Sequence, residues 1–372
     1  MKFVNKVRNL IPVDYKEKVK DILYPEDIYT ASGSIEPTKV LHLDDCPNLY
    51  TKEANHSFQC GDLSIYIYDN VTFWPSQSVA KKGEFTISQT YIDDKRIGIL
   101  RDRSLLRKFP VERIEGYATS VDYIYSPHNY FHQFVDTLPR IWSLRHDALK
   151  GLPITLLLSR KLGEQEYRIY KALLPENVKL RYVNRFRRIK ADHYIHLPFL
   201  SRDRVDYSSS TYTSAGFIPN EYLNHYRNLT YNLFDTSPEN RSINIYLTRK
   251  FTSKRFIKNE GEIEQFLESK GFEIIAPEKL SMKKQIQLFS SSNIIVAQMG
   301  AALTNLLYAG RGGGLIEINS SPDIPQHFSV HAKVLEKAYV PILSEQSTIH
   351  DDIILPLEQL KRSLNELERD ML

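Results

Sequence analysis

The spacing of hydrophobic residues changes along the chain and divides it into segments of different structure. Residues 1–30 place apolar side chains among lysines at helical spacing, which predicts a helix. From about 35 to 115 apolar and polar residues alternate, most clearly in LSIYIYDNV and GEFTISQTYI, as they do in half-buried strands. The pattern becomes helical over 128–144, and helices and strands then mix up to about 225.

A regular alternation of strands and helices fills the second half of the chain. The stretch before it, 234–242, is polar and contains Pro238, which predicts a domain boundary. The helix after the first strand is predicted to be capped by Asn259 and to stop at Gly271, and Ser281 is predicted to open the next helix. The expected strands cover 243–248, 272–277, 293–298 and 315–319. This spacing predicts an α/β fold with a parallel sheet covered on both faces.

The length of the chain, 372 residues, exceeds what one hydrophobic core usually supports. We therefore divide it into a domain at 1–233, a domain at 234–345, and a C-terminal segment at 346–372. The first domain contains the β-rich stretch 35–115 and the helical stretch 128–144. The C-terminal segment has the pattern of a strand followed by an amphipathic helix.

Composition excludes several classes of protein. Hydrophobic residues make up 42% and charged residues 25%, as in soluble globular proteins, and the net charge of +4 is too small to argue for nucleic acid. No apolar run approaches the roughly 20 residues of a membrane span, and the basic N-terminus lacks the apolar core of a signal peptide. We therefore expect a cytoplasmic protein. Its N-terminal lysines either make a peripheral contact with anionic lipids on the inner face of a membrane or form the solvated side of a docked helix.

Candidate binding residues follow the predicted strands of the second half. Ligands of parallel α/β sheets bind at the carboxyl ends of the strands. The loops expected to line a site are those that follow residues 248, 277, 298 and 318. The first loop contains Arg249, Lys254 and Arg255, whose charges suit a diphosphate, although a solvated basic loop would have the same composition.

Two further features belong to the same predicted edge of the sheet. The sequence GAALTN at 300–305 combines small residues with a helix start. Small residues let the backbone approach a ligand, and a helix start offers unpaired N–H groups, so this loop and the basic loop together form a candidate pyrophosphate cradle. Glu317 lies in the otherwise apolar fourth strand. A buried carboxylate there either accepts hydrogen bonds from ribose hydroxyls or is paired with an arginine.

The helical stretch HNYFHQFVDTLPRIWSL carries the candidate acid–base chemistry. At helical spacing one side of it carries Asn129, His132, Asp136 and Arg140. His132 and Asp136 are four residues apart, so the carboxylate can orient the imidazole, and such a pair can take a proton from a hydroxyl group. In the alternative interpretation Asp136 bridges Arg140 on a surface helix. In both cases Pro139 is expected to kink the helix.

A metal site is not indicated by the sequence. No Asp-x-Asp pair occurs, so the usual two-carboxylate seat of a metal–nucleotide complex is missing, and two cysteines are too few for a cysteine-rich metal site. We therefore expect neither a metal nor a cofactor. Basic side chains and a helix end would have to neutralise a leaving diphosphate.

The run from LTRK at 247–250 to LIEI at 315–318 closely resembles glycosyltransferase family 61, and HNYFHQFVDTLPR resembles the N-terminal signature of that family. The resemblance extends over about 120–320. Members include a eukaryotic O-linked N-acetylglucosaminyltransferase that acts on EGF repeats, plant xylan-decorating enzymes and bacterial capsule-biosynthesis proteins. The resemblance implies an inverting mechanism with a nucleotide-sugar donor and usually no catalytic metal. It also implies a GT-B fold, two Rossmann-like domains facing a cleft, here with an extra β-rich N-terminal segment. By analogy with GT-B proteins, the segment 346–372 is expected to pack back on the first domain.

The resemblance assigns roles to individual residues. The expected nucleotide-sugar-binding residues are Arg249, Arg255, Asn259, Glu260, Gln285, Gly300, Ala301, Leu303, Thr304, Asn305 and Glu317, to which the basic loop adds Lys254. His132 and Asp136 match the N-terminal signature and form the expected catalytic pair, with Asp136 favoured as the base and His132 positioning the acceptor. Asn129 and Tyr130 are expected to contact the acceptor. Met299 departs from the family, whose signature has a histidine there, so the role of that histidine is vacant or filled elsewhere.

Two main hypotheses about function follow, besides a third in which the protein transfers a group other than a sugar, since doubly wound sheets support many reactions. In the first, the protein transfers a sugar from a nucleotide-sugar, a UDP-sugar in our expectation, to a saccharide or glycolipid acceptor in capsule or lipopolysaccharide biosynthesis. In the second, which Met299 keeps open, it is a catalytically silent nucleotide-sugar-binding or glycan-binding subunit of a polysaccharide synthesis complex.

Overall fold

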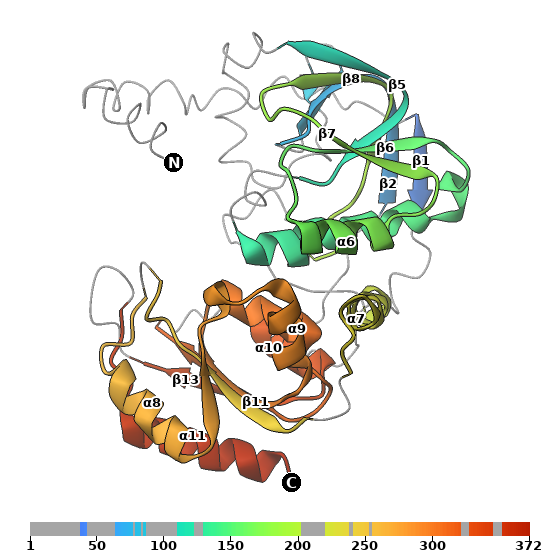
Figure 1. The fold of residues 1–372 in the computed structure, drawn as a ribbon. Coiled ribbons are helices and arrows are strands. Elements are labelled where there is room, and N and C mark those ends of the chain that lie inside the picture. The colour runs from blue at the N-terminus through green and yellow to red at the C-terminus, as the bar shows by residue number, and fades with distance from the viewer. Residues whose placement is uncertain are drawn as a thin grey trace, which may run out of the picture.

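The computed structural model of the protein describes residues 38–42, 64–76, 79–82, 85–86, 110–122, 129–201, 220–237, 241–252, 255–320, 327–344 and 352–372. These residues form two β-sheets with helices packed on them, one sheet in each half of the chain (Figure 1). The predicted α/β class is confirmed. The helix expected at 1–30 lies outside the described residues. In the part of the chain that is described, no helix is both long enough and apolar enough to cross a membrane.

The first sheet combines a parallel core with an antiparallel extension. Its strands are β1 (Lys39–His42), β2 (Ser64–Trp74), β3 (Val79–Lys82), β4 (Phe85–Thr86), β5 (Val111–Ser120), β6 (Ile154–Leu158), β7 (Val178–Tyr182) and β8 (Arg188–His196). Strands β7, β6, β5 and β8 are neighbours in that order and all parallel. The antiparallel strands β2, β3 and β4 extend the sheet beyond β8, and β1 pairs with β2. The described part of the predicted β-rich stretch is therefore this extension together with the start of β5.

The stretch expected to be one helix over 128–144 forms two helices of different winding. A π-helix, η4 (His132–Thr137), continues directly into a 3-10 helix, η5 (Leu138–Arg145). The change falls beside Pro139, which lacks an N–H donor and whose ring crowds the preceding turn. A kink was expected at Pro139, and the structure shows a change of helix type there. The first half also contains η6 (Asp147–Leu149) and α6 (Glu164–Leu173).

The second sheet has five strands, all parallel, in the order β10-β9-β11-β12-β13. They are β9 (Ile243–Leu247), β10 (Phe272–Ile275), β11 (Ser292–Gln298), β12 (Gly314–Asn319) and β13 (Ala338–Leu343). The first four lie in the segments that the sequence predicts as strands. Because β10 lies on one side of β9 and β11 on the other, the direction of strand order reverses between β9 and β11.

Helices cover both faces of the second sheet, as predicted. α8 (Glu260–Ser269) and α11 (Leu357–Asp370) contribute to the apolar core on one face. α9 (Met282–Ser290), η8 (Ala301–Tyr308) and α10 (His327–Val334) contribute to the core on the other face. A short 3-10 helix, η7 (Pro277–Lys279), follows β10.

The C-terminal segment packs on the second sheet, so the expectation that it packs back on the first domain was wrong. Helix α11 lies against β12 and β13 and away from the first half (Figure 1). Its apolar stripe, which includes Leu360, Leu364 and Leu367, completes the core beside α8. Before the helix, Ile353 forms a parallel bridge with Ile257. The stripe therefore covers a sheet face that would otherwise expose apolar side chains to water.

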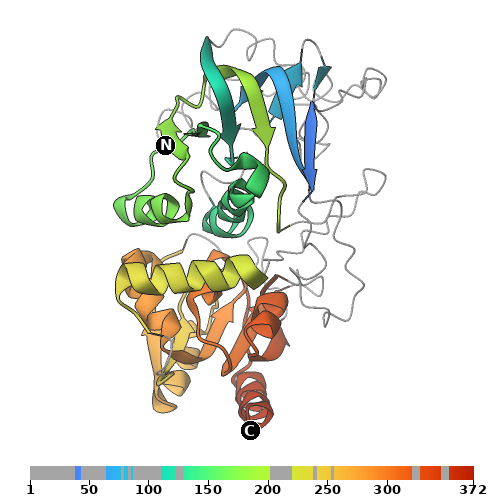
Figure 2. The ribbon, with the colours of Figure 1, turned by 90° about the vertical axis from the view of Figure 1, so that its right-hand side faces the viewer.

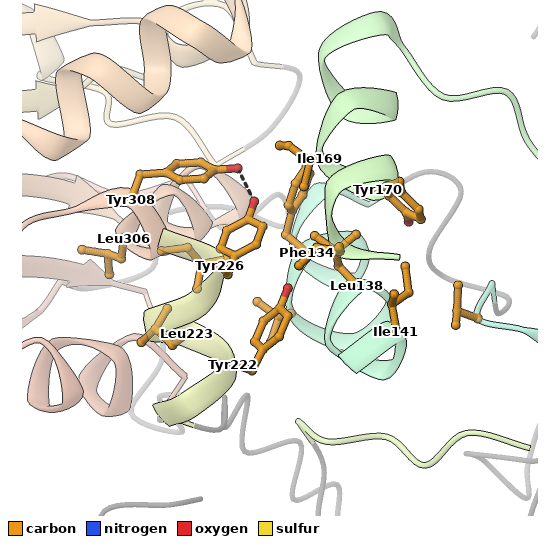
Figure 3. Close-up of a cluster of buried hydrophobic side chains, with 14 of the residues drawn as sticks. Phe134, Leu138, Ile141, Ile169, Tyr170, Tyr222, Leu223, Tyr226, Leu306 and Tyr308 are labelled. Carbon is orange, nitrogen blue, oxygen red and sulfur yellow. Dashed lines mark hydrogen bonds between the residues drawn. The ribbon is translucent and has the colours of Figure 1, made fainter. Parts of the chain in front are cut away.

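The two halves share one continuous apolar core. Helix α7 (Asn220–Phe234) packs against α6 of the first half and against α9 and η8 of the second (Figure 2). Phe134 of η4, Tyr222 and Tyr226 of α7 and Tyr308 of η8 all belong to this cluster (Figure 3). The hydroxyl groups of Tyr226 and Tyr308 are 2.8 Å apart. Helix η4 is thus held against the second half of the chain.

Candidate functional site

The carboxyl ends of β9 and β11 bring two predicted site residues together. Arg249 lies just beyond the end of β9, and Gly300 lies just beyond the end of β11. The guanidinium lies so close to Gly300 that a Cβ on residue 300 would be 2.7 Å from Arg249 Nη1. Because strand order reverses between β9 and β11, this is the position at which open α/β sheets bind their ligands.

Arg255 adds a second guanidinium at the same place. Its carbonyl oxygen accepts a hydrogen bond of 3.0 Å from Arg249 Nε. Its own Nη1 lies 3.4 Å from the carbonyl oxygen of Met299 and 3.8 Å from Met299 Sδ. Arg255 has a φ of 63°, a left-handed conformation that residues with a Cβ rarely adopt. Lys254, expected in the same cluster, lies outside the described residues.

Two guanidinium groups lie close together at this edge of the sheet. Burial is the largest cause that lowers the pKa of Arg249 from its usual value, and the charge of Arg255 lowers it further. An arginine nevertheless stays protonated in a protein. Two cations in a half-buried place repel each other, and an anion bound between them removes that repulsion. A diphosphate, which guanidinium groups bind through paired hydrogen bonds, has the matching charge and geometry.

Glu260 holds the end of β9. Its Oε1 accepts hydrogen bonds from Tyr246 Oη (3.0 Å), Thr248 Oγ1 (3.0 Å) and the backbone N–H of Arg249 (2.8 Å). Its side chain is buried, and Glu264, one turn further along α8, also lies 2.9 Å from Thr248 Oγ1. These contacts position Arg249 through its backbone. A contact between Glu260 and the donor stays a prediction.

Asn259 occupies the N-cap position of α8, but the predicted capping by its side chain was wrong. Its Oδ1 accepts a hydrogen bond from the backbone N–H of Leu355 (3.0 Å), and its Nδ2 donates to the carbonyl oxygen of Leu355 (2.8 Å). The C-terminal segment offers this side chain a matched donor and acceptor, which the helix end cannot. Asn259 therefore anchors the segment before α11, and its contact with the donor stays a prediction.

The predicted cradle at 300–305 is only partly at the surface. Ala301 is exposed, and Gly300 is covered by Arg249. Leu303 packs in the apolar core, and Thr304 is buried with its Oγ1 lacking a partner among the described residues. Asn305 is also buried, and its side chain forms hydrogen bonds with two other predicted site residues.

Gln285, Asn305 and Tyr130 form a chain of hydrogen bonds. Asn305 Nδ2 donates to Gln285 Oε1, and the Tyr130 hydroxyl donates to Asn305 Oδ1, both at 2.8 Å. Two residues expected at the donor and one expected at the acceptor thus contact each other. Their contacts with substrates stay predictions.

Glu317 is fully buried in β12. Its Oε2 accepts a hydrogen bond of 2.9 Å from the hydroxyl of Tyr339, and its Oε1 is buried without a partner among the described residues. Burial raises the pKa of Glu317 to about 7, against which the hydrogen bond from Tyr339 acts only in part. An arginine was one expected partner for this carboxylate, and the observed partner is Tyr339. A contact of Glu317 with ribose hydroxyls stays a prediction.

The structure brings His132 and Asp136 into contact in η4. His132 Nδ1 lies 2.7 Å from Asp136 Oδ2, and Asp136 Oδ1 accepts a hydrogen bond from Ser201 Oγ. The side chain of Asp136 is 2% exposed and that of His132 is 22% exposed. Both carboxylate oxygens are therefore engaged inside the protein, while part of the imidazole remains accessible. The residue before this turn, Asn129, accepts a hydrogen bond of 3.0 Å from the backbone N–H of Phe131.

Arg140 fixes the helix pair at the edge of the first sheet. Its Nε and Nη2 donate to the carbonyl oxygen of Leu197 at 3.1 and 2.8 Å, and its Nη1 donates to that of Val121 at 3.0 Å. These carbonyls follow β8 and β5, between which the strand order of the parallel core reverses. Arg140 and Asp136 are both buried, so the alternative of a surface helix was wrong. Asp136 thus lies near the switch point of the first sheet, as Arg249 lies at that of the second.

Sequence reasoning missed two residues of these sites. Ser201 binds the candidate catalytic carboxylate, and Tyr339 binds Glu317. A serine in a loop carries no local signal. Tyr339 lies in β13, a strand that we did not predict from the sequence, and the apolar residues of 338–343 are the signal that could have found it.

The sequence profile of the family described as Glycosyltransferase 61 matches residues 130–316, half of the chain. The match runs from Tyr130, just before η4, to Ile316 in β12, and so includes the His132–Asp136 pair and the β9/β11 switch point, whereas β5 lies before it. The protein therefore belongs to the glycosyltransferase 61 family, and transferase activity is the function that membership suggests. No curated protein sequence matches the chain.

Proposed function

We propose that the protein is an inverting glycosyltransferase that takes a sugar from a nucleotide-sugar donor, a UDP-sugar, and transfers it to a glycan acceptor. The observation that carries this proposal is the pair of guanidinium groups of Arg249 and Arg255 at the β9/β11 switch point. A nucleoside diphosphate is both the leaving group of such a reaction and the anion that this position fits. Ala301 and the exposed side of the loop at Met299 border the same place.

A GT-B arrangement is the architecture that we propose for the two halves. Each half has a parallel sheet whose strand order reverses, and each reversal lies next to expected site residues. Tyr130, which precedes η4, is hydrogen-bonded to Asn305 of η8, the helix that follows the loop we assign to the donor. This supports an active site shared by the two halves, with the acceptor on the side of η4.

The chemical step that we propose is a single displacement at the anomeric carbon. His132 takes the proton of the acceptor hydroxyl, the acceptor oxygen forms a bond to the anomeric carbon, and the bond from that carbon to the diphosphate breaks with its electron pair leaving on the nucleoside diphosphate. Arg249 and Arg255 offset the charge that develops on the leaving group, which is the role a divalent metal has in other transferases.

His132 suits the role of the base better than Asp136, which the sequence favoured. In the neutral tautomer in which Nδ1 donates to Asp136 Oδ2, the other ring nitrogen carries no proton and can accept one. Asp136 is buried, and its other oxygen is held by Ser201, so a substrate hydroxyl would reach the imidazole first. In this assignment Asp136 fixes the tautomer of His132 and stabilises the protonated ring.

A catalytically silent binding subunit is the second candidate. Met299 favours it, because its thioether, which lies 3.8 Å from Arg255 Nη1, cannot donate a hydrogen bond to phosphate as the histidine of the family signature can. For either candidate we propose a cytoplasmic role in capsule or lipopolysaccharide synthesis, on the basis of the resemblance to bacterial family members.

One experiment separates the candidates. The purified protein is incubated with excess chelator and a panel of nucleotide-sugars, and the release of nucleoside diphosphate is measured together with binding of each nucleotide-sugar. The proposal predicts release with one donor, lost in Arg255→Ala. Binding without release on any donor, with or without added saccharide acceptors and metal ions, would favour the silent subunit, and a strict need for manganese or magnesium would contradict the proposed role of the arginines.

A further inference from the structure

A continuous chain of hydrogen bonds connects the start of η4 to the loop after β10. The Tyr130 hydroxyl donates to Asn305 Oδ1, and Asn305 Nδ2 donates to Gln285 Oε1, each at 2.8 Å. Gln285 Nε2 then donates to the carbonyl oxygens of Pro277 (2.9 Å) and Leu280 (3.1 Å). The chain thus starts in the first half of the protein and runs through η8 and α9 of the second half to the segment around η7.

The backbone carbonyls of Pro277 and Leu280, at the end of the chain away from Tyr130, determine which group is the donor in each hydrogen bond. Two backbone carbonyls can only accept, so the side-chain amide of Gln285 must direct its NH₂ group towards Pro277 and Leu280 and its oxygen towards Asn305. Asn305 must then direct its own NH₂ group towards Gln285, which leaves its oxygen for Tyr130. The one group that completes the chain is a hydroxyl that donates.

Tyr130 is suited to stay a donor. Burial is the largest cause that raises the pKa of Tyr130 well above its usual value, and the neighbouring Tyr308 adds to it, so the hydroxyl keeps its proton at any pH of interest. Phenylalanine would fill the same space and leave Asn305 Oδ1 without its donor.

Phe131 provides a second contact of the same turn with the second half. Its ring centroid is 5.0 Å from that of His327 and 5.8 Å from that of Phe328, both on α10. On its other side it is 5.5 Å from the ring of His132. The two residues that directly precede His132 are thus both fixed to the second half, one by a hydrogen bond and one by ring packing.

We infer that Tyr130, Asn305 and Gln285 form a latch that sets the position of the His132 turn relative to the donor loop. They are positioning residues, and they contact neither donor nor acceptor in this role. Asn305 lies in η8, the helix that starts directly after Gly300, so a shift of that loop on binding a donor is transmitted to Tyr130. The inference about His132 rests on the proposed function, whereas the latch between the two halves does not.

Hydrogen exchange of the free protein tests the latch without any assumption about activity. In Tyr130→Phe and in Asn305→Ala the backbone amides of η4 (His132–Thr137) are expected to exchange about 5- to 10-fold faster than in the wild type, the ratio that corresponds to one buried neutral hydrogen bond. Tyr167→Phe, which removes an exposed hydroxyl, is the matched control and should change nothing. Unchanged exchange in η4 in Tyr130→Phe, a variant that keeps the ring and should fold, would overturn the latch.

Steady-state kinetics then test what the latch does for the reaction. Tyr130→Phe is expected to lower kcat by about 5- to 10-fold with little change in the KM of either substrate, and Tyr130→Phe combined with Asn305→Ala should be no worse than Asn305→Ala alone. A raised KM for the acceptor with additive losses would show that Tyr130 binds the acceptor, and would overturn the positioning role. If the protein transfers no sugar, the proposed function fails, and the exchange result still decides the latch.

Discussion

The guanidinium of Arg249 lies against Gly300, in space that no other residue at position 300 would leave open. The φ of Gly300 is 169°, an extended conformation that any residue adopts, so the backbone does not require glycine. The requirement is steric, because an added Cβ would be 2.7 Å from Arg249 Nη1 and thus well inside van der Waals contact. The absence of a side chain at position 300 thereby leaves room for the cation that follows β9.

Gly300→Ala is expected to weaken nucleotide binding without unfolding the protein. The atom in the way belongs to the far end of a flexible side chain, so Arg249 can move at little cost in stability, but its guanidinium then leaves the place in which it would meet a diphosphate. We expect the affinity for nucleoside diphosphate, measured by calorimetry, to fall by about 5- to 20-fold. This loss corresponds to part of the free energy that one hydrogen bond to a charged group contributes. Gly261→Ala in α8, where a Cβ meets nothing within 4 Å, is the control. Equal affinity in both variants would mean that the Arg249 guanidinium does not bind phosphate from this position.

Arg249→Ala and Arg255→Ala should each weaken binding of a nucleoside diphosphate by about 1.5–3 kcal/mol, the usual worth of a hydrogen bond to a charged group. Lys250→Ala removes a cation of the same loop whose ammonium is instead paired with Glu264, and serves as the control. Calorimetric titration of the three variants checks this. If Lys250→Ala costs as much as the two arginine variants, the loop acts through its general charge and the assigned contacts are wrong.

The second sheet and the position of its site could be predicted from the sequence, because hydrophobic periodicity is a local property. Arg249 and Gly300 each follow a predicted strand, and parallel strands that are neighbours end at the same edge. What could not be predicted is that the two residues touch, since neither periodicity nor spacing reports a distance between side chains.

The surroundings of Asp136 could not be predicted, because its partner Ser201 is 65 residues away along the chain and only tertiary packing brings it close. The same holds for Asn259. Its side-chain amide binds the backbone of Leu355, 96 residues further along the chain, and does not cap the helix. Phe134 and Val135 of the π-helix η4 likewise pack in a core that contains residues of the second half. Residues that bridge distant segments leave no periodic pattern.

Glu317 is expected to make the protein less stable as pH rises from about 4.5 to about 7. Its pKa is raised by burial to about 7, while the unfolded chain has the usual value of 4.5, so between these values the folded protein binds more protons than the unfolded one. The contribution of Glu317 to the free energy of unfolding then falls with rising pH across this window, by on the order of 3 kcal/mol for a shift of this size, and is constant above it.

Denaturant unfolding of the wild type and of Glu317→Gln at pH 5 and pH 8 checks this expectation. The glutamine keeps an acceptor for Tyr339 and cannot ionise, so the variant should gain stability relative to the wild type as pH rises. Glu273→Gln, on the exposed side of β10, controls for the charge change. A difference between wild type and Glu317→Gln that is the same at both pH values would show that the carboxyl is not protonated by burial.

His132→Ala and Asp136→Asn are each expected to lower turnover by about 10²–10⁴-fold, the usual contribution of a positioned general base, with donor affinity nearly unchanged. The first variant removes the base, and the second leaves an imidazole whose tautomer the neighbouring side chain no longer fixes. The chain offers a matched control in His193 and Asp69, whose Nδ1 and Oδ1 are also 2.7 Å apart, in the first sheet between β8 and β2. Alanine at 193 and asparagine at 69 should leave turnover as it is.

Added imidazole distinguishes which member of the pair takes the proton. If His132 is the base, His132→Ala leaves a space in which a free imidazole can accept the proton of the acceptor hydroxyl, so millimolar imidazole should restore part of the lost turnover. Asp136→Ala should not respond to imidazole, because the natural imidazole is still present and lacks only its carboxylate partner; formate or azide would be the molecule that helps. If formate or azide restores Asp136→Ala to nearly full rate while imidazole does nothing for His132→Ala, then Asp136 is the base, and the exposure of the imidazole has misled the assignment. If all variants keep the wild-type rate, the pair only holds η4 to Ser201, and the base lies on another element of the shared site.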